Sequence, residues 1–255
     1  MADDRYSKFD YSRLIAWDER LNREWPFFES ALRDAPSKKL LDLGSGTGEH
    51  ARMLGSKGFD VTGVDSSPAM LEKSRAAAPV ENIRFVEGNL RDLGSLFHEQ
   101  FGAAICVGNV LPHLNEPGDL ERFSAGLRHV LLPGAPFVLQ VLNYNRIEIK
   151  RERALPLSFL PDRDNPGATI IFLRSMELLP DGRIIFMPTT LRQWIDREEP
   201  IELVSTRRVE IRGWRRDQIE GALRGAGFES IEVFGTHQRA PFDPAESRDV
   251  ILVAR

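Results

Sequence analysis

The chain has 255 residues, 42% of them hydrophobic, so it can bury one sizeable core. Its 38 acidic and 34 basic residues give a net charge of −4, which offers no electrostatic attraction to nucleic acid or to an anionic membrane. The first residues lack the charged and apolar segments of a signal peptide, and no apolar run reaches the ~18 residues of a membrane span. We therefore expect a soluble, cytoplasmic protein without nucleic-acid or membrane partners.

The only cysteine, Cys106, lies in the apolar run 103–107 and is expected to be a small buried hydrophobic residue. A catalytic thiol is the alternative interpretation. A single thiol forms neither an internal disulfide nor a cysteine-rich zinc site, and we predict no metal site.

Residues 1–37 are expected to form a helical lid. Within residues 11–34, apolar residues recur at spacings of three and four, which predicts one apolar helix face. Pro26 interrupts this pattern, so we expect two helices or a kink at that point.

Strands and helices alternate between residues 38 and 143. The apolar strands are predicted at residues 39–43, 60–65, 83–86, 103–107 and 136–142. Helices are predicted at residues 47–57, after Ser67-Pro68 and at residues 120–131. Apolar strands separated by helices are typical of a parallel, doubly wound sheet that is covered on both faces. Such sheets bind ligands at the carboxyl ends of their strands.

The pattern changes at residues 144–213, which we interpret as an antiparallel β insertion that covers the substrate or forms a dimer contact. Its long strands are predicted at residues 169–179, 183–192 and 201–212. Residues 214–255 then supply a helix at 215–226 and paired strands at 230–234 and 249–254. The predicted fold is α/β: a Rossmann-like, doubly wound, seven-stranded sheet of residues 38–143 and 214–255, with the last strand antiparallel.

The strongest motif follows the first strand, where Gly44, Gly46 and Gly48 alternate before a helix begins. Glycines let the backbone approach a ligand closely, and the helix N-terminus offers unpaired N–H groups. An ordinary tight turn is the alternative interpretation. Asp65 ends the next strand, where a carboxylate can accept both hydroxyl hydrogens of a ribose. Asn89 and Leu90 follow the third strand, where an adenine ring would lie.

The spacing of the glycines separates two kinds of cofactor. A dinucleotide fingerprint requires a third glycine at position 49, but Glu49 stands there and would oppose a pyrophosphate. Asp42 adds a second carboxylate, which suits a ligand with an ammonium and a sulfonium group.

The run from Asp42 to Gly48 resembles the Asp/Glu-x-Gly-x-Gly-x-Gly motif of the class I S-adenosylmethionine (SAM)-dependent methyltransferases. The resemblance implies that SAM is the cofactor and S-adenosylhomocysteine the product. It places the three glycines near the methionine moiety, Asp65 on the ribose, and Asn89 and Leu90 beside the adenine. Val107 would close the methionine side. The implied cofactor site also includes Ser66 and Met70, with Tyr11 and Trp17 as covering aromatic residues, although Trp17 could instead belong to the apolar helix face.

Several stretches are similar to the glycine and sarcosine N-methyltransferases, including Trp17-Asp18-Glu19-Arg20 and Asn143-Tyr144. In that group, an arginine in the region of Arg20 reaches the SAM carboxylate. An arginine directly before the Asn-Tyr pair grips the carboxylate of the amino-acid substrate, but Leu142 stands there and cannot form such a pair. Either another arginine, Arg146 or Arg174, does this work, or the substrate carries no carboxylate at that point.

Methyl transfer is a direct displacement that requires alignment of the nucleophile and exclusion of water. His113 is the predicted general base, with Asn109 and Tyr144 as further catalytic residues and a structural role for His113 and Tyr144 as the alternative. The predicted function is transfer of a methyl group from SAM to nitrogen or oxygen of a small-molecule acceptor, in a possible homodimer. The alternatives are a nicotinamide-dependent oxidoreductase and a non-catalytic SAM-binding module.

Overall fold

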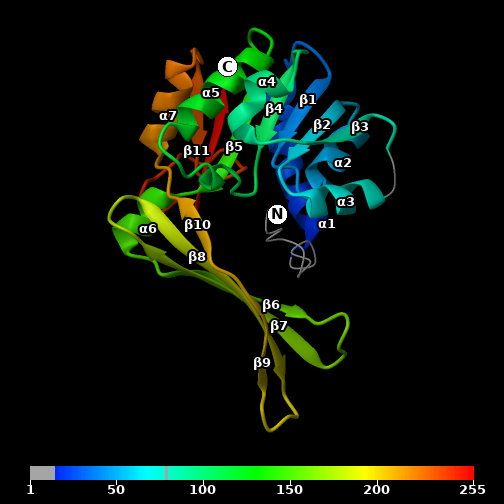
Figure 1. The fold of residues 1–255 in the computed structure, drawn as a ribbon, viewed down its shortest axis with the longest axis vertical. Coiled ribbons are helices and arrows are strands. Elements are labelled where there is room, and N and C mark those ends of the chain that lie inside the picture. The colour runs from blue at the N-terminus through cyan, green and yellow to red at the C-terminus, as the bar shows by residue number, and fades with distance from the viewer. Residues whose placement is uncertain (1–14, 78–79) are drawn as a thin grey trace.

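The computed structural model describes residues 15–77 and 80–255, which build two sheets (Figure 1). The first part of the chain contains α1 (Trp17–Leu32), β1 (Lys39–Leu43), α2 (Glu49–Ser56), β2 (Asp60–Asp65), α3 (Pro68–Ala76), β3 (Ile83–Glu87), the 3₁₀-helix η2 (Leu90–Asp92), α4 (Leu93–Leu96), β4 (Ala103–Cys106), the 3₁₀-helix η3 (Leu111–His113), α5 (Asp119–Val130) and β5 (Phe137–Leu142). The second part contains α6 (Tyr144–Lys150), β6 (Ala154–Pro161), β7 (Ala168–Leu178), β8 (Arg183–Trp194), β9 (Ile201–Thr206), β10 (Val209–Arg212), α7 (Arg216–Gly225), β11 (Ile231–Phe234) and β12 (Asp249–Ala254).

The larger sheet has seven strands in the order β11-β12-β5-β4-β1-β2-β3. Strands β1 to β5 pair in parallel, whereas β12 is antiparallel to both of its neighbours, β5 and β11. The chain places β2 and β3 on one side of β1 and then returns to place β4 and β5 on the other. The strand order therefore reverses between β1 and β4, where ligands of such sheets bind. This topology confirms the predicted seven-stranded α/β fold with an antiparallel last strand.

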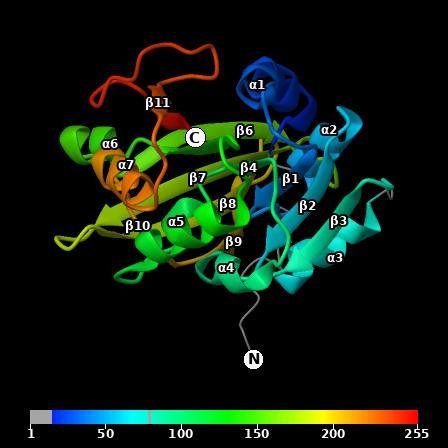
Figure 2. The same cartoon turned by 90° about the horizontal axis from the view of Figure 1, so that it is seen from above.

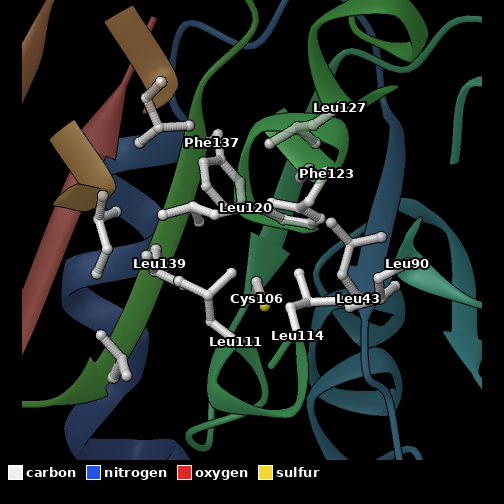
Figure 3. Close-up of a cluster of buried hydrophobic side chains, with 14 of the residues drawn as sticks. Leu43, Leu90, Cys106, Leu111, Leu114, Leu120, Phe123, Leu127, Phe137 and Leu139 are labelled. Atoms are coloured by element: carbon white, nitrogen blue, oxygen red, sulfur yellow. The ribbon is translucent and has the colours of Figure 1, made fainter. Parts of the chain in front are cut away.

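Helices cover both faces of this sheet (Figure 2). Alternate residues of each strand point to opposite faces, so Leu41 and Leu43 pack in the cluster that contains α5 and α7, whereas Leu40 packs in the cluster with α1 and α2. Figure 3 shows the first cluster, in which the Cys106 thiol lies among leucine and phenylalanine side chains. Cys106 is fully buried, and burial raises the pKa of its thiol well above the usual range. The interpretation as a buried hydrophobic residue is confirmed.

Helix α1 continues through Pro26, so of the two expected alternatives the division into two helices is wrong, while a kink stays a prediction. A proline inside a helix costs about 3 kcal/mol because it lacks an N–H and crowds the preceding turn. Pro26 is exposed, while its neighbours Phe27 and Phe28 are buried against the sheet. Burial of each large side chain contributes about 1.5–3 kcal/mol, so the packing of the opposite face offsets the proline.

The predicted insertion is an antiparallel sheet of five strands, and three of its details differ from expectation. It begins with a helix, α6, because the Asn143 side chain caps that helix by accepting a hydrogen bond from the Arg146 backbone at 3.3 Å. The predicted strand 201–212 is two strands, β9 and β10, which pair with different halves of β8. The break lies opposite Pro188, which has no N–H to donate to the ladder. Strand β6 has no counterpart in the sequence prediction.

The carboxyl ends of β1 to β5 lie at the edge from which the second sheet departs, because β5 runs directly into α6 (Figure 1). Strand β10 lies against η3, so the second sheet reaches the loop that follows β4. None of the helices in residues 15–77 and 80–255 is long and apolar enough to span a membrane.

Candidate cofactor and substrate site

The glycine loop between β1 and α2 holds all three glycines at positive φ: Gly44 at 74°, Gly46 at 53° and Gly48 at 87°. These are left-handed conformations that favour glycine. At Gly44 a side chain is also excluded by space, because a Cβ there would lie 2.4 Å from Val110 in the loop after β4. At Gly46, no described atom lies within 4 Å of such a Cβ, so the loop is open at that point. Gly44 therefore lies against the β4 loop, and the close approach of the loop to a ligand stays a prediction.

Asp65 lies at the carboxyl end of β2 and faces the glycine loop. Its Oδ2 accepts a hydrogen bond from the Gly46 N–H at 2.8 Å, and its Oδ1 accepts one from the Ser67 N–H at 2.9 Å. The carboxylate therefore fixes the loop in addition to any contact with a ligand. Ser66 is exposed beside it, and Met70 is buried one turn into α3.

The β3 end presents one polar and one apolar residue, as the sequence predicts. Asn89 is exposed and caps η2, because its Oδ1 accepts a hydrogen bond from the Arg91 N–H at 3.0 Å. Leu90 is buried in the core cluster. Both lie beside the end of β2, since β2 and β3 are neighbours in the sheet.

Asn109 and Tyr144 come together from two different strand ends. Asn109 has a φ of 66°, its Oδ1 accepts a hydrogen bond from the Leu142 N–H at 3.0 Å, and its Nδ2 lies 3.1 Å from the Tyr144 hydroxyl. Tyr144 is only 4% exposed, and burial raises the pKa of its phenol well above the usual range. The pair fixes the loop after β4, and Val107 at the start of that loop is buried.

His113 lies at the end of η3 with an exposed side chain. Its backbone carbonyl accepts a hydrogen bond from Arg91, which also forms an ion pair with the buried Asp119 at 2.6 Å. The turn that carries His113 is therefore held against the neighbouring β3 loop. Tyr11 lies outside the described residues.

Helix α1 brings Arg20 and Trp17 to the same end of the sheet. The Arg20 guanidinium lies over the Trp17 ring at 5.2 Å, and its Nη2 is 4.0 Å from the position of a Cβ at Gly108. Sequence reasoning missed the partner of Arg20: the buried Glu24 accepts hydrogen bonds from Arg20 Nε and from His50 Nε2, both at 2.8 Å. Burial alone would raise the pKa of Glu24, but the His50 hydrogen bond and the Arg20 charge lower it to about 2.

Gln140 and Asp249 form a second support that the sequence did not reveal. Gln140 Oε1 accepts a hydrogen bond from the Gly108 N–H at 2.8 Å, and Gln140 Nε2 donates one to Asp249 at 2.7 Å. Burial raises the pKa of Asp249. The link therefore runs from β12 through β5 to the loop after β4.

The two arginines proposed for a substrate carboxylate are each engaged elsewhere through part of the guanidinium, while the buried Nε of each has no hydrogen-bond partner among the described residues. Arg146 forms an ion pair with Glu152 at 2.5 Å. Arg174 stacks on Phe172 and donates to the Pro156 carbonyl at 3.0 Å. Leu142 contributes only its backbone N–H, to Asn109. Trp214 is a core residue that donates to the Leu114 carbonyl at 2.8 Å.

The site residues fit a cofactor with cationic groups. Asp42 is 2% exposed, and its Oδ2 has no hydrogen-bond partner among the described residues; the same holds for Ser45 Oγ and Trp17 Nε1. At the start of α2, Glu49 accepts from Thr47 at 2.5 Å and pairs with Arg52 at 3.3 Å, which leaves a carboxylate where a pyrophosphate would bind. The unpaired Oδ2 of Asp42 and the Glu49 carboxylate near the glycine loop favour an ammonium or sulfonium over a phosphate. Among the described residues no cluster could hold a metal ion.

Asp42 also contributes to the dependence of stability on pH. Burial, followed by the charges of Asp65 and Glu49, raises its pKa from 3.8 to about 6 against the lowering effect of His50. The unfolded chain ionises Asp42 near pH 4 and the folded protein near pH 6, so folding loses free energy as the pH rises through this window. We predict that Asp42→Asn stabilises the ligand-free protein by about 2 kcal/mol more at pH 8 than at pH 4.

Urea unfolding of wild type and variant at both pH values measures this difference, with the exposed Asp60→Asn on the neighbouring strand as control. An equal effect of Asp42→Asn at the two pH values would contradict the prediction.

Comparisons with known proteins show what the chain is similar to. Residues 40–134 match the family model of a methyltransferase domain. The chain is 33% identical over 139 residues to a glycine/sarcosine N-methyltransferase of Parasynechococcus marenigrum (strain WH8102), which covers 54% of this chain and 49% of that protein. The corresponding enzyme of Aphanothece halophytica is 34% identical over 139 residues, with 54% and 52% covered. The chain thus spans about half the length of the curated relatives it matches.

Solved structures extend the likeness to nearly the whole chain. The CcbJ methyltransferase from Streptomyces caelestis is 26% identical, with a TM-score of 0.70 over 92% of this chain and 89% of that one. CalS10 from Micromonospora echinaspora, an amino pentose methyltransferase solved with SAM bound, has a TM-score of 0.69 at 21% identity, with 95% and 93% covered. The sheet order and these matches together show that residues 40–134 carry a methyltransferase domain and that the described residues have the fold of solved methyltransferases.

Proposed function

We propose that the protein is an enzyme that transfers the methyl group of SAM to an amine nitrogen of a small acceptor. One observation carries the proposal: the open glycine loop, Asp65 and Arg20 converge from β1, β2 and α1 on the point where the strand order reverses. The methionine carboxylate needs an arginine, which is Arg20. The cationic centre needs a buried carboxylate, Asp42, and the ribose needs a second carboxylate, Asp65.

Each end of the cofactor has its own group of residues in this proposal. Arg20 binds the methionine carboxylate, and Asp42 faces the cationic groups. Asp65 accepts the ribose hydroxyls while it holds Gly46. The remaining residues of the cofactor site are Trp17, Gly44, Gly48, Ser66, Met70, Asn89, Leu90 and Val107. When bound, SAM supplies an activated methyl group for direct displacement.

The acceptor approaches over the loop after β4, where His113 is exposed. His113 would remove the proton from the attacking amine, because a neutral imidazole is a base near physiological pH. Tyr144 is buried and bonded to Asn109, which supports a positioning role for this pair rather than direct contact with the acceptor. Both residues then act by fixing the loop that carries His113.

The acceptor in this proposal carries no carboxylate next to its amine. The end of β5 presents Leu142, and both nearby arginines already have partners. Glycine and sarcosine are the substrates named for the curated relatives, and an amino pentose for CalS10. The absence of an arginine at position 142 favours an amine without a carboxylate, such as an amino sugar.

Two parts of the chain enclose the site in this proposal. Of the predicted lid, residues 1–37, the part from residue 15 onward is described, and in this proposal it acts as a lid, since Arg20 of α1 reaches the Gly108 loop. Residues 144–213 cover the acceptor, since β10 lies against η3. Residues 38–143 and 214–255 form the SAM-binding domain between them. We also propose that the protein is located in the cytoplasm.

Calorimetric titration with SAM, S-adenosylhomocysteine and NAD⁺ tests the cofactor. We expect both adenosyl compounds to bind and NAD⁺ not to bind. Asp65→Ala should weaken SAM by about 100-fold, since two charge-assisted hydrogen bonds are together worth roughly 3 kcal/mol. Asp60→Ala, at the exposed start of the same strand, should have no effect. Binding of NAD⁺ without binding of SAM would overturn the proposed function.

Pairs of acceptors that differ only in a carboxylate test the substrate class. We expect glycinamide and simple amino sugars to be methylated with a kcat/KM about tenfold or more above that of glycine, because a buried carboxylate without a cation is costly. Leu142→Arg should reduce the difference in kcat/KM between glycinamide and glycine, because the arginine supplies a bidentate partner for the glycine carboxylate. Preference of the wild type for glycine or sarcosine would contradict the assignment.

A second copy of the chain is the proposed partner of the antiparallel sheet. Phe159, Ile171, Leu191 and Leu203 are directly paired across β6 to β9 and therefore line one face, with Phe159 and Leu203 each 60% exposed. Sedimentation velocity should show a dimer for wild type and a monomer for Phe159→Glu/Leu203→Glu, whereas the exposed Glu199→Gln should stay dimeric. A monomeric wild type at every concentration would refute this contact.

A further inference from the structure

Glu24 is a charged residue on the buried face of α1, where it is 3% exposed. Its two oxygens have separate partners: Oε1 accepts from Arg20 Nε at 2.8 Å, and Oε2 accepts from His50 Nε2 at 2.8 Å. The buried carboxylate therefore joins α1 to the first turn of α2. A buried ion pair is weak evidence for stability, because desolvation offsets much of the attraction. The arrangement calls for a reason beyond holding two helices together.

That reason lies in the geometry of Arg20. Glu24 fixes the guanidinium at Nε, and the Trp17 ring lies beneath it at 5.2 Å. The His50 ring packs edge-to-face with the same tryptophan, with 5.7 Å between the ring centroids. Trp17 therefore contacts both the Arg20 guanidinium and the His50 imidazole. With Nε engaged, the Nη2 end of the fork points to the loop after β4, 4.0 Å from a Cβ position at Gly108.

The second anchor of this network is the glycine loop itself. His50 is the second residue of α2, and the N-cap of that helix is Gly48. Any shift of the loop relative to α1 would break the His50–Glu24 hydrogen bond. The network therefore sets the guanidinium of α1 at a fixed place relative to the loop that approaches the cofactor.

We propose that Glu24 and His50 are positioning residues that aim the Arg20 fork at the carboxylate of the methionine moiety of SAM. This inference rests on the proposed function, in which Arg20 binds that carboxylate. Glu24 and His50 touch neither the cofactor nor the acceptor, and they act only through Arg20. A bidentate arginine–carboxylate pair is sensitive to orientation, so a loosened guanidinium binds the carboxylate less well.

Two ligands separate positioning from simple stabilisation of the fold. S-adenosylhomocysteine and 5′-methylthioadenosine share the adenosine and the thioether, but only the former carries the amino and carboxylate groups. We expect Glu24→Gln and His50→Gln to lower the affinity for S-adenosylhomocysteine by about tenfold and to change the affinity for methylthioadenosine by less than about twofold. The exposed Glu29→Gln on the same helix should change neither ligand.

Two further variants test whether the effect passes through Arg20. Arg20→Ala should weaken S-adenosylhomocysteine at least as much as Glu24→Gln, and the double variant Arg20→Ala/Glu24→Gln should lose no more than Arg20→Ala alone. Arg20→Lys keeps the charge without the fork and should behave like Glu24→Gln. It retains Glu24 and His50, so it tests the fork even where loss of Glu24 prevents folding.

The outcomes separate this inference from the proposed function. Equal weakening of both ligands by Glu24→Gln, additive losses in the double variant, or no loss in any variant would overturn the positioning role while leaving a SAM site in place. Failure of the wild type to bind either ligand would overturn the proposed function itself.

Discussion

The constraint on which the candidate site depends is the contact between two loops, one after β1 and one after β4. A Cβ at Gly44 would lie 2.4 Å from Val110, so these loops touch only because position 44 has no side chain. The backbone N–H groups of Gly44 and Ser45 both donate to the Val64 carbonyl, which ties the same loop to β2. Three neighbouring strand ends are thus locked together, and every other feature of the site is placed relative to them.

The strands of the larger sheet could be predicted from sequence because they are buried on both faces and therefore read as short apolar runs. The errors fall where one local signal competes with packing. Pro26 signals a break, but the buried Phe27 and Phe28 keep α1 continuous. Residues 201–212 form a continuous β pattern, yet the break in the ladder is set by Pro188 on a different strand. Local patterns contain no information about such a partner.

The positions of the glycine loop and of Asp65 were also predictable, because the spacing of glycines and the end of an apolar strand can be recognised from residues that are adjacent in sequence. The supporting contacts were not, since the fold joins residues that are far apart in sequence: Glu24 with His50, and Gln140 with Asp249. One signal for Glu24 was present. It lies seven residues after Trp17 and four before Phe28, on the same helix face, and a charge on an apolar face needs a partner. Sequence spacing alone could not say that the partner was a histidine of α2.

The two buried carboxylates near the cofactor site differ in a way that bears on the ligand. Glu24 has a guanidinium and an imidazole as hydrogen-bond donors, and its pKa falls to about 2. Asp42 is equally buried, but its pKa rises to about 6 and its Oδ2 has no partner among the described residues. A buried acceptor without a donor costs about 1–3 kcal/mol, so folding alone would favour a smaller or apolar residue there. A cationic ligand removes that cost when it binds, because it pairs with the Asp42 carboxylate. A phosphate does not remove it, so the buried carboxylate favours binding of a sulfonium or ammonium over a phosphate.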